Sequence, residues 1–216
     1  MGYKGRVFSI GVVILFNVMR YFYYHSYYGL PFEANFFILT TVFLFVAWWT
    51  GKQYDKAKYY SEKDPLTDTY NRRTINRRFQ KPTTRDKKMI LVMIDLDNFK
   101  EINDTHGHQA GDDLLVEIAQ LLKRLSSGRD DCIARWGGDE FLLLVGNPDQ
   151  NFKSTFTHSL LAELQNIKAL EYTSFGASIG FATFPDDGQT LEQLIQKADS
   201  EMYKMKESKP VQRTSR

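Results

Sequence analysis

Two runs without charged residues open the chain. Residues 7–19 and 34–51 contain no Asp, Glu, Lys or Arg and are largely apolar. The second run approaches the roughly 20 residues that cross a bilayer core, and Trp48 and Trp49 near its end suit the membrane interface. The first run reaches that length only through Arg20, which must then snorkel or face a partner helix. The pattern predicts a transmembrane hairpin over residues 1–50, with spans at about 7–24 and 34–50.

The alternative is one span beside a buried or interfacial helix. A cleavable signal peptide is disfavoured because no small-residue cleavage site follows the first run. Lys and Arg lie outside the two runs, and the connection over residues 25–33 has neither, so the positive-inside rule places both ends in the cytoplasm. The basic residues on which this orientation rests are Lys4, Arg6, Lys52, Lys56 and Lys58. We expect a multi-pass protein of the inner (cytoplasmic) membrane.

Residues 51–63 form a charged linker without proline. They can continue the second span as a helix or act as a solvated spacer. From residue 64 the pattern alternates between elements, with a folded domain expected over 64–209 and a tail over 210–216. We expect helices within 64–80 and from 98 to about 125, then at 152–169 and 191–206, and strands at 89–97, on both sides of Gly137-Gly138 and within 172–183. This order predicts an α+β, ferredoxin-like β-α-β-β-α-β domain with additions.

Composition narrows the possible partners. The chain is 43% apolar and 25% charged with a net charge of +2, so nothing indicates the dense cationic face of a nucleic-acid-binding protein. Cys132 is the single cysteine and lies in an expected strand. It predicts a buried thiol in a reducing compartment, without disulfides.

Acidic residues follow the apolar run 89–97. Asp95 and Asp97 are two residues apart, so in a strand they point to one side while Leu96 points into the core. Carboxylate oxygens of this kind suit Mg²⁺. Asp139 and Glu140 lie in a hairpin that this fold places beside the first strand, where they would complete a metal site. Each motif alone is typical of an ordinary turn or strand end.

Asn103 and Asp112 are nine residues apart, which puts them on opposite faces of one continuous helix. They converge only if the chain turns near Gly107 or Gly111. An amide and a carboxylate brought together there can read the edge of guanine, although two helix caps are the alternative. Lys100 and Lys206 can reach phosphates, or remain solvated surface lysines.

Together these motifs resemble the GGDEF family of diguanylate cyclases, with a nucleotidyl-cyclase-like fold. The resemblance covers residues 64 to about 209 and rests on DPLTDTYNRR, IDLDNFKEINDTHGHQAGD, RWGGDEF and ADSEMYKMK. It implies Mg²⁺ or Mn²⁺, with two ions per half-site. The resemblance implies that the metal is bound by Asp95, the Leu96 carbonyl, Asp139 and Glu140. It implies that guanine and the rest of the substrate are bound by Asn103, His108, Asp112 and Lys206. The catalytic residues it implies are Asp139, Glu140 and Lys100.

The implied reaction condenses two GTP molecules into cyclic di-GMP and two pyrophosphates in a homodimer. A membrane-anchored signalling enzyme is therefore expected, with a partner membrane protein as a possible source of input. Two alternatives are a catalytically silent nucleotide-binding module and a nucleotidyltransferase acting on nucleic acid, the latter disfavoured by the near-zero net charge.

The chain departs from the family pattern at Asp68-Thr69, where the family more often has Gly-Leu and a tolerated loop change is expected, and at two functional positions. Where many members have Arg-x-x-Asp before the signature, Gly128 stands in the arginine's position and Asp131 in that of the acid, with Arg129 one residue out of register. We expect weak or absent product inhibition there. At the end of the last helix, Lys209 and Pro210 replace Gly-Arg, and Lys209 could contact phosphate in the arginine's place.

Overall fold

The computed structural model describes residues 2–29, 34–80, 88–126, 131–167 and 175–209. The chain divides into two compact units, Met1–Glu62 and Lys63–Arg216. Each unit has its own internal packing and is described by itself.

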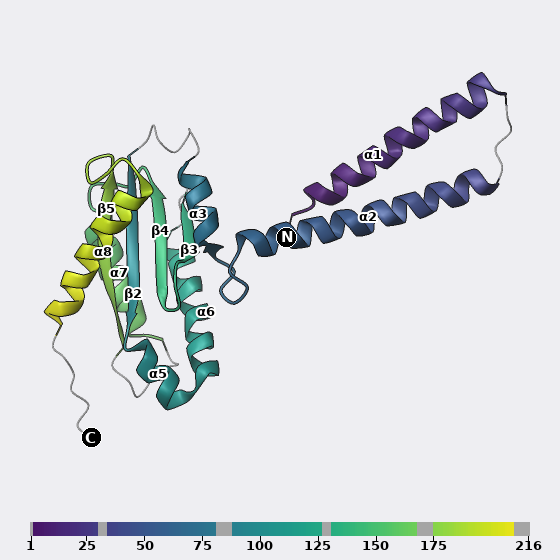
Figure 1. Cartoon of the computed structure of the whole chain (residues 1–216). Helices are drawn as coiled ribbons and strands as arrows, with labels where there is room; N and C mark the ends of the chain where they lie inside the picture. Colours follow the sequence, from purple (N-terminus) through teal and green to yellow (C-terminus); the bar gives the residue numbers. More distant parts are fainter. Residues whose placement is uncertain (1, 30–33, 81–87, 127–130, 168–174, 210–216) are drawn as a thin grey trace. The chain divides into compact units, whose positions relative to one another are not determined.

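The first unit is an antiparallel helical hairpin (Figure 1). α1 (Lys4–Tyr21) continues into a π-helical turn, η1 (Phe22–Tyr27), and α2 (Ala34–Glu62) returns alongside it. By length and composition, the segments Lys4–Tyr27 and Ala34–Glu62 could each cross a membrane. α2 continues without a break through residues 51–62. The linker is therefore helical, which is one of the two forms that the sequence allowed.

Contacts between α1 and α2 involve small and polar residues. A Cβ added to Gly5 would lie 2.9 Å from the carbonyl oxygen of Gly51, so the two backbones approach closely where both residues are glycine. Arg20 donates to the carbonyl of Phe36 at 2.9 Å and to the hydroxyl of Thr40 at 2.8 Å. Arg20 therefore faces the second helix of its own hairpin.

The second unit is built on a five-stranded sheet in the order β1-β3-β4-β2-β5. β1 is parallel to β3, and the other neighbouring pairs are antiparallel. The strands are β1 (Tyr70–Asn71), β2 (Met89–Asp97), β3 (Cys132–Arg135), β4 (Glu140–Gly146) and β5 (Gly176–Phe184). Strands β2 to β5 with their helices make the predicted ferredoxin-like core, in which the β3–β4 hairpin pairs with β2.

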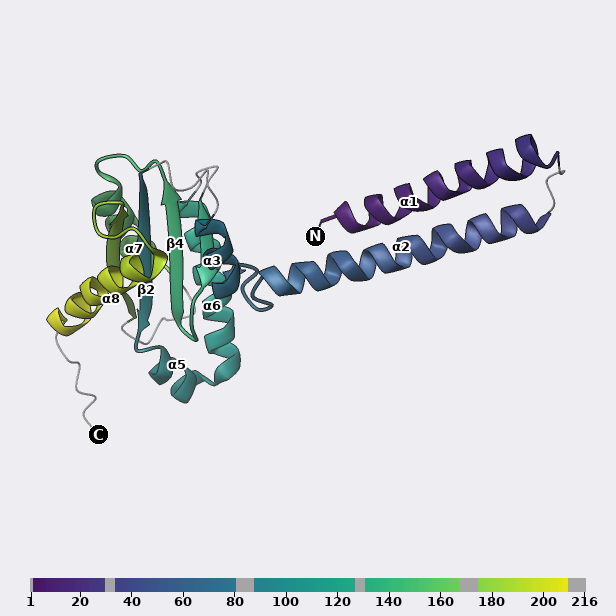
Figure 2. The ribbon, with the colours of Figure 1, turned by 45° about the horizontal axis from the view of Figure 1, so that its top comes forward.

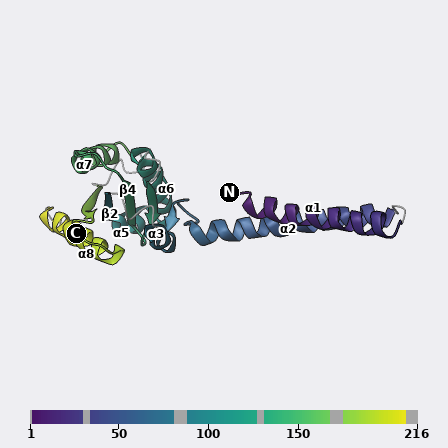
Figure 3. The same cartoon turned by 90° about the horizontal axis from the view of Figure 1, so that it is seen from above.

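Helices cover both faces of the sheet. Figures 2 and 3 show α6 and α7 on one face and α3 and α8 on the other. The helices of this unit are α3 (Arg72–Phe79), α5 (Phe99–His106), α6 (His108–Leu125), α7 (Phe152–Leu164) and α8 (Leu191–Ser208).

Side chains of β2 point alternately into two apolar clusters, one on each face of the sheet. Ile94 and Leu96 pack in the apolar cluster of α6 and α7, whereas Leu91 and Met93 pack in the cluster that includes residues of α3 and α8. Leu96 is 1% exposed. Because strand side chains alternate, Asp95 and Asp97 continue the α8 side, as predicted.

Three expectations need correction. The helix expected within 64–80 is α3, but it is preceded by a turn in which Asp64 accepts from the Thr67 amide and by the short strand β1, which was not expected. The helix expected to reach Ala169 ends at Leu164, and residues 168–174 lie outside the described part of the chain. The last helix continues to Ser208. Cys132 is a buried free cysteine, as expected.

Candidate active site

Two acids from neighbouring strands meet at one end of the sheet. Asp95 of β2 and Glu140 of β4 are directly paired in the antiparallel register, which puts their side chains on the same side of the sheet. The carbonyl of Asp139 accepts from the amide of Leu96 at 3.3 Å. The tip of the β3–β4 hairpin is therefore tied to the end of β2, and the predicted metal ligands lie together.

Arg135 holds this hairpin tip in place. Its Nε and Nη2 donate to the carbonyl of Gly138 at 3.0 and 2.7 Å, and its Nη1 lies 3.4 Å from a carboxylate oxygen of Asp64. Asp64 also accepts from the amide and hydroxyl of Thr67. This role was not predicted from the sequence, because Asp64 and Arg135 are 71 residues apart and each alone is an ordinary charged residue.

Gly137 leaves space for a neighbouring acid. A Cβ at this position would lie 2.6 Å from a carboxylate oxygen of Glu140. At Gly138 a Cβ would have no atom within 4 Å, and the residue is exposed. The absent side chain at Gly137 thus lets the Glu140 carboxylate fold back over the turn. Close approach of nucleotide to the backbone here stays a prediction.

Two lysines at the end of α8 face the acids. Nζ of Lys206 lies 2.5 Å from Oδ1 of Asp95, and Nζ of Lys209 lies 2.5 Å from Oδ2 of Asp97. Asp95 is 8% exposed, whereas Lys206 is an exposed residue. Each acid of β2 therefore has a cationic partner, and the partner of Asp95 is open to solvent.

The electrostatics of this end of the sheet favour an added cation. Burial, with repulsion from Asp139 and Asp97, raises the pKa of Asp95 despite its bond to Lys206. Burial and repulsion from Asp95 and Asp139 raise the pKa of Glu140. Burial alone would lower the pKa of Lys206, but its bond and attraction to Asp95 raise it. The carboxylates are crowded enough to oppose one another's ionisation, which a bound cation would relieve.

The donor set fits a hard divalent cation, because it consists of carboxylate and carbonyl oxygens. Among the described residues, no three His, Cys, Asp or Glu side chains stand close enough together to hold a metal ion as they are. The ammonium of Lys206 engages the Asp95 carboxylate instead. A cation held jointly by Asp95 and Glu140 would therefore share the Asp95 carboxylate with this lysine or take its place.

The residues expected to bind guanine lie around a break between two helices. α5 and α6 are separated at Gly107, which has φ of +83° and so favours glycine. The amide oxygen of Asn103 lies against Gly111, where an added Cβ would collide with it. The break thus brings Asn103 beside the turn that carries Asp112, as the spacing required.

The remaining predicted residues are exposed. Lys100, His108 and Asp112 are open to solvent on α5 and α6. Figure 1 shows α5 at the same end of the sheet as the β3–β4 turn. The structure therefore places the proposed guanine and metal residues at one end of the domain.

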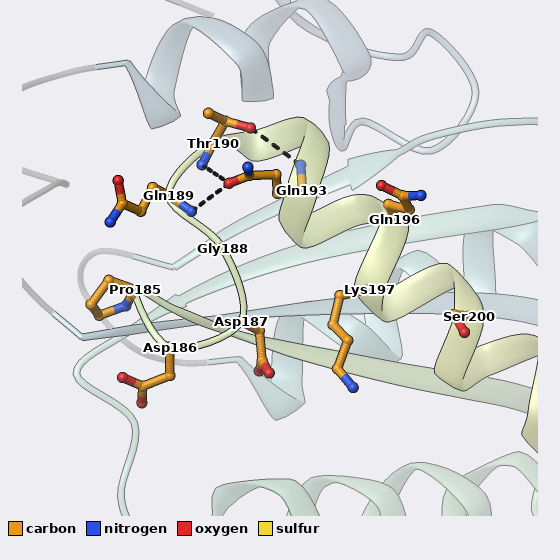
Figure 4. Close-up of a pocket in the computed structure, with 10 residues that line it drawn as sticks. All are labelled: Pro185, Asp186, Asp187, Gly188, Gln189, Thr190, Gln193, Gln196, Lys197 and Ser200. Carbon is orange, nitrogen blue, oxygen red and sulfur yellow. Dashed lines mark hydrogen bonds between the residues drawn. The ribbon is translucent and has the colours of Figure 1, made fainter.

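A surface depression lies at the other end of the sheet (Figure 4). It is bordered by Pro185 to Thr190 and by the first turns of α8, including Gln196 and Ser200. Phe184, next to it, pairs with Met89 at the start of β2, whereas Gly176 pairs with Asp97 at the end. None of the predicted site residues lines this depression.

The proposed product-inhibition positions are only partly described. Asp131 accepts from the amide of Gly146 at 3.2 Å, next to the β3–β4 hairpin. Gly128 and Arg129 lie outside the described residues. Weak product inhibition stays a prediction.

Comparison with known proteins defines the class. The family model described as diguanylate cyclase, GGDEF domain, matches residues 61–212. The chain belongs to the GGDEF-domain family.

Individual relatives agree with this assignment. The chain is similar to the biofilm architecture maintenance protein MbaA of Vibrio cholerae, with 40% identity over 71% of the chain and 21% of the relative. It is 35% identical to the bifunctional diguanylate cyclase/cyclic di-GMP phosphodiesterase MucR of Pseudomonas aeruginosa, over 67% of the chain and 22% of the relative. The GGDEF domain of PA1120 (TpbB or YfiN) from Pseudomonas aeruginosa superposes with a TM-score of 0.58 at 31% identity, covering 68% of this chain and 90% of that one. The chain thus spans about a fifth of the length of MbaA and MucR.

Proposed function

We propose that this protein is a membrane-anchored diguanylate cyclase that condenses two GTP molecules into cyclic di-GMP and two pyrophosphates. The observation that carries the proposal is the pairing of Asp95 with Glu140 across β2 and β4, with Lys206 facing Asp95. An acid pair with a solvent-exposed lysine beside it suits a site that receives a metal and a triphosphate.

The substrate is oriented by residues around the helix break. The side chains of Asn103 and Asp112 accept from guanine N–H groups, a donor pattern that adenine lacks. His108 lies at the same substrate site. Lys100 and Lys206 contact phosphate oxygens and stabilise the charge that develops as pyrophosphate leaves.

The reaction is an in-line displacement at phosphorus. The 3′-hydroxyl oxygen of one GTP bonds to the α-phosphorus of the other, the bond to pyrophosphate breaks, and Asp139 takes the hydroxyl proton, with Glu140 as the alternative acceptor. Mg²⁺ or Mn²⁺, two ions per half-site, would be held by the Asp95, Asp139 and Glu140 carboxylates and the Leu96 carbonyl. When bound, the metal neutralises the triphosphate and lowers the pKa of the attacking hydroxyl.

Each domain holds one GTP, so a homodimer brings two half-sites together to form both new bonds. The hairpin α1–α2 anchors the dimer in the inner (cytoplasmic) membrane, with both ends and the domain in the cytoplasm. Support for this location comes from the two apolar helices and from the distribution of Lys and Arg around them. A partner membrane protein could supply the input.

A second function is a silent GGDEF module that binds nucleotide and signals through partners. The observation that favours it is at the end of α8, where Pro210 stands in the position of the family's arginine and Lys209 is bonded to Asp97. Loss of a phosphate contact there would slow the chemistry while leaving binding intact.

The decisive experiment incubates the full chain in nanodiscs with GTP and Mg²⁺ and measures cyclic di-GMP by mass spectrometry, beside Asp139→Ala. Cyclic di-GMP from the wild type but not from the variant supports the cyclase. A folded, dimeric, GTP-binding sample that forms no product supports the silent module.

A further inference from the structure

The side chain of Lys209 is fully engaged by acceptors at the ends of β2 and β5. Its Nζ lies 2.5 Å from Oδ2 of Asp97, 2.8 Å from the carbonyl of Ala177 and 3.0 Å from Oγ of Ser178. An ammonium group has three donors, and these three acceptors can satisfy all of them. Lys209 therefore has no donor left for a phosphate in this arrangement.

The surroundings of Asp97 are shaped to receive this lysine. Ser178 donates its hydroxyl to Oδ1 of Asp97 at 2.7 Å, which leaves Oδ2 for Lys209. Gly176 is the residue paired with Asp97, and a Cβ there would lie 2.9 Å from Oδ2. Side chains at 97 and 209 are only 14% and 34% exposed. Four residues from two strands, Asp97 of β2 and Gly176, Ala177 and Ser178 of β5, thus build one socket for Lys209.

This socket fixes the end of α8, which carries Lys206. Lys209 caps α8, and its amide donates to the carbonyl of Lys206 at 3.4 Å. Residues three apart lie on the same side of a helix, so the two ammonium groups reach β2 together, at Asp97 and Asp95. Without the Lys209 contact, the last turn of α8 would lose its anchor, because helix ends fray readily.

We propose that Lys209 and Asp97 are positioning residues that set the location of Lys206 at the active site. The proposal rests on the cyclase function proposed above. Lys209 therefore makes a structural contact rather than a phosphate contact: it secures the helix end, and Lys206 makes the phosphate contact.

The activity test is a set of mutant cycles in the full chain in nanodiscs. Lys209→Met and Asp97→Asn should each lower kcat about tenfold with little change in KM, since a full misplacement of about 1 Å costs on the order of 10²-fold and the bond of Lys206 to Asp95 limits the shift. The double variant should be no slower than either single variant. Lys209→Met should have no further effect in a Lys206→Met background, and Lys209→Arg should restore most of the rate. Lys204→Met, at an exposed position of the same helix, is the matched control.

The same variants distinguish a direct phosphate contact. If Lys209→Met slows the reaction while Asp97→Asn does not, Lys209 contacts substrate and the proposal is wrong. Additive losses in the Lys206→Met background would also overturn it, because Lys209 would then act independently of Lys206.

Hydrogen exchange tests the socket without reference to activity. Lys209→Met and Asp97→Asn should increase amide exchange in the last turn of α8 and leave β2 and β4 unchanged, which also verifies folding. Unchanged exchange in that turn would contradict the proposal. A wild type that shows no cyclase activity but gives the expected exchange pattern would overturn the proposed function and retain the socket.

Discussion

Asp95 and Glu140 face one another across the β2–β4 pair, although 45 positions separate them along the chain, from 95 to 140. Burial, together with repulsion from Asp139 and Asp97 at Asp95 and from Asp95 and Asp139 at Glu140, keeps both carboxyl pKa values above their ordinary range. A bound cation would therefore stabilise this end of the sheet, whereas ionisation of the Asp95 and Glu140 carboxyl groups destabilises it.

Glu140→Gln should stabilise the metal-free domain at neutral pH. The raised pKa means that the folded state holds the proton of Glu140 more tightly than the unfolded chain does, so stability falls as pH rises through the folded pKa. Glutamine removes that loss. Urea unfolding of residues 63–216 without divalent cations should give the variant a higher free energy of unfolding than the wild type at pH 7. This difference should vanish at pH values below the pKa of Glu140 in the unfolded chain.

Glu163→Gln, on the exposed side of α7, is the matched control and should give no such pH-dependent gain. A Glu140→Gln domain that is less stable than the wild type at neutral pH would show that Glu140 is not under electrostatic strain.

Divalent cation binding without nucleotide should weaken as pH falls. Protons compete for Asp95 and Glu140 at a higher pH than for ordinary carboxylates, because both pKa values are raised.

Lys206→Met should tighten Mn²⁺ binding, since the ammonium no longer competes for Asp95, and should still lower the cyclase rate. Calorimetric Mn²⁺ titrations check this, and weaker binding by the variant would contradict the competition.

Arg135→Ala should loosen the β3–β4 turn. It removes charge-assisted bonds to the Gly138 carbonyl and to Asp64, a loss of about 2 kcal/mol in the free energy of unfolding. Cyclase activity should fall further than stability explains, because the same carbonyl lies beside Asp139. Arg135→Lys should rescue little, since an ammonium lacks the guanidinium fork. Urea unfolding measures the effect on stability, and initial rates measure the effect on activity. A variant that keeps wild-type rates would show that the bonds of Arg135 to Gly138 and Asp64 are not needed for activity.

Gly111→Ala should weaken GTP binding by about tenfold, the equivalent of one lost hydrogen bond. The new methyl group would displace the amide of Asn103. Fluorescent GTP-analogue titrations should show the same loss for Asn103→Ala and no further loss in the double variant. Additive losses would mean that Gly111 matters for another reason.

Cyclic di-GMP should inhibit the enzyme weakly. Gly128 lacks the side chain that the family's product site uses, and Arg129 is out of register. Product titrated into initial-rate assays should act only by competition with GTP. Strong non-competitive inhibition that Arg129→Ala removes would be the opposite result.

The strand β2 and a break between Asn103 and Asp112 follow from local pattern, and the structure places the break at Gly107, one of the two glycines the sequence offered. Side chains alternate along any strand, and glycine adopts a positive φ readily. Asp95 and the β3–β4 hairpin could be placed together because the ferredoxin-like topology pairs their strands.

The contacts that the sequence did not predict are long-range and have no periodic signal. Arg135 and Asp64 are 71 residues apart, and Lys209 and Asp97 are 112 apart. Each residue alone is an ordinary charged residue. Strand β1 was missed because it has only two residues and is stabilised by pairing with β3, which no local propensity reveals.

α2 ends at Glu62, and the next residues are already bonded within the domain: Lys63 bridges to Tyr70, and the Asp64 amide donates to the Thr69 carbonyl at 2.8 Å. Along the chain, α2 is therefore followed directly by residues that are bonded within the second unit. Adding or removing one residue in the charged part of α2, residues 51–62, would rotate every later position of that helix by about 100° relative to the earlier ones.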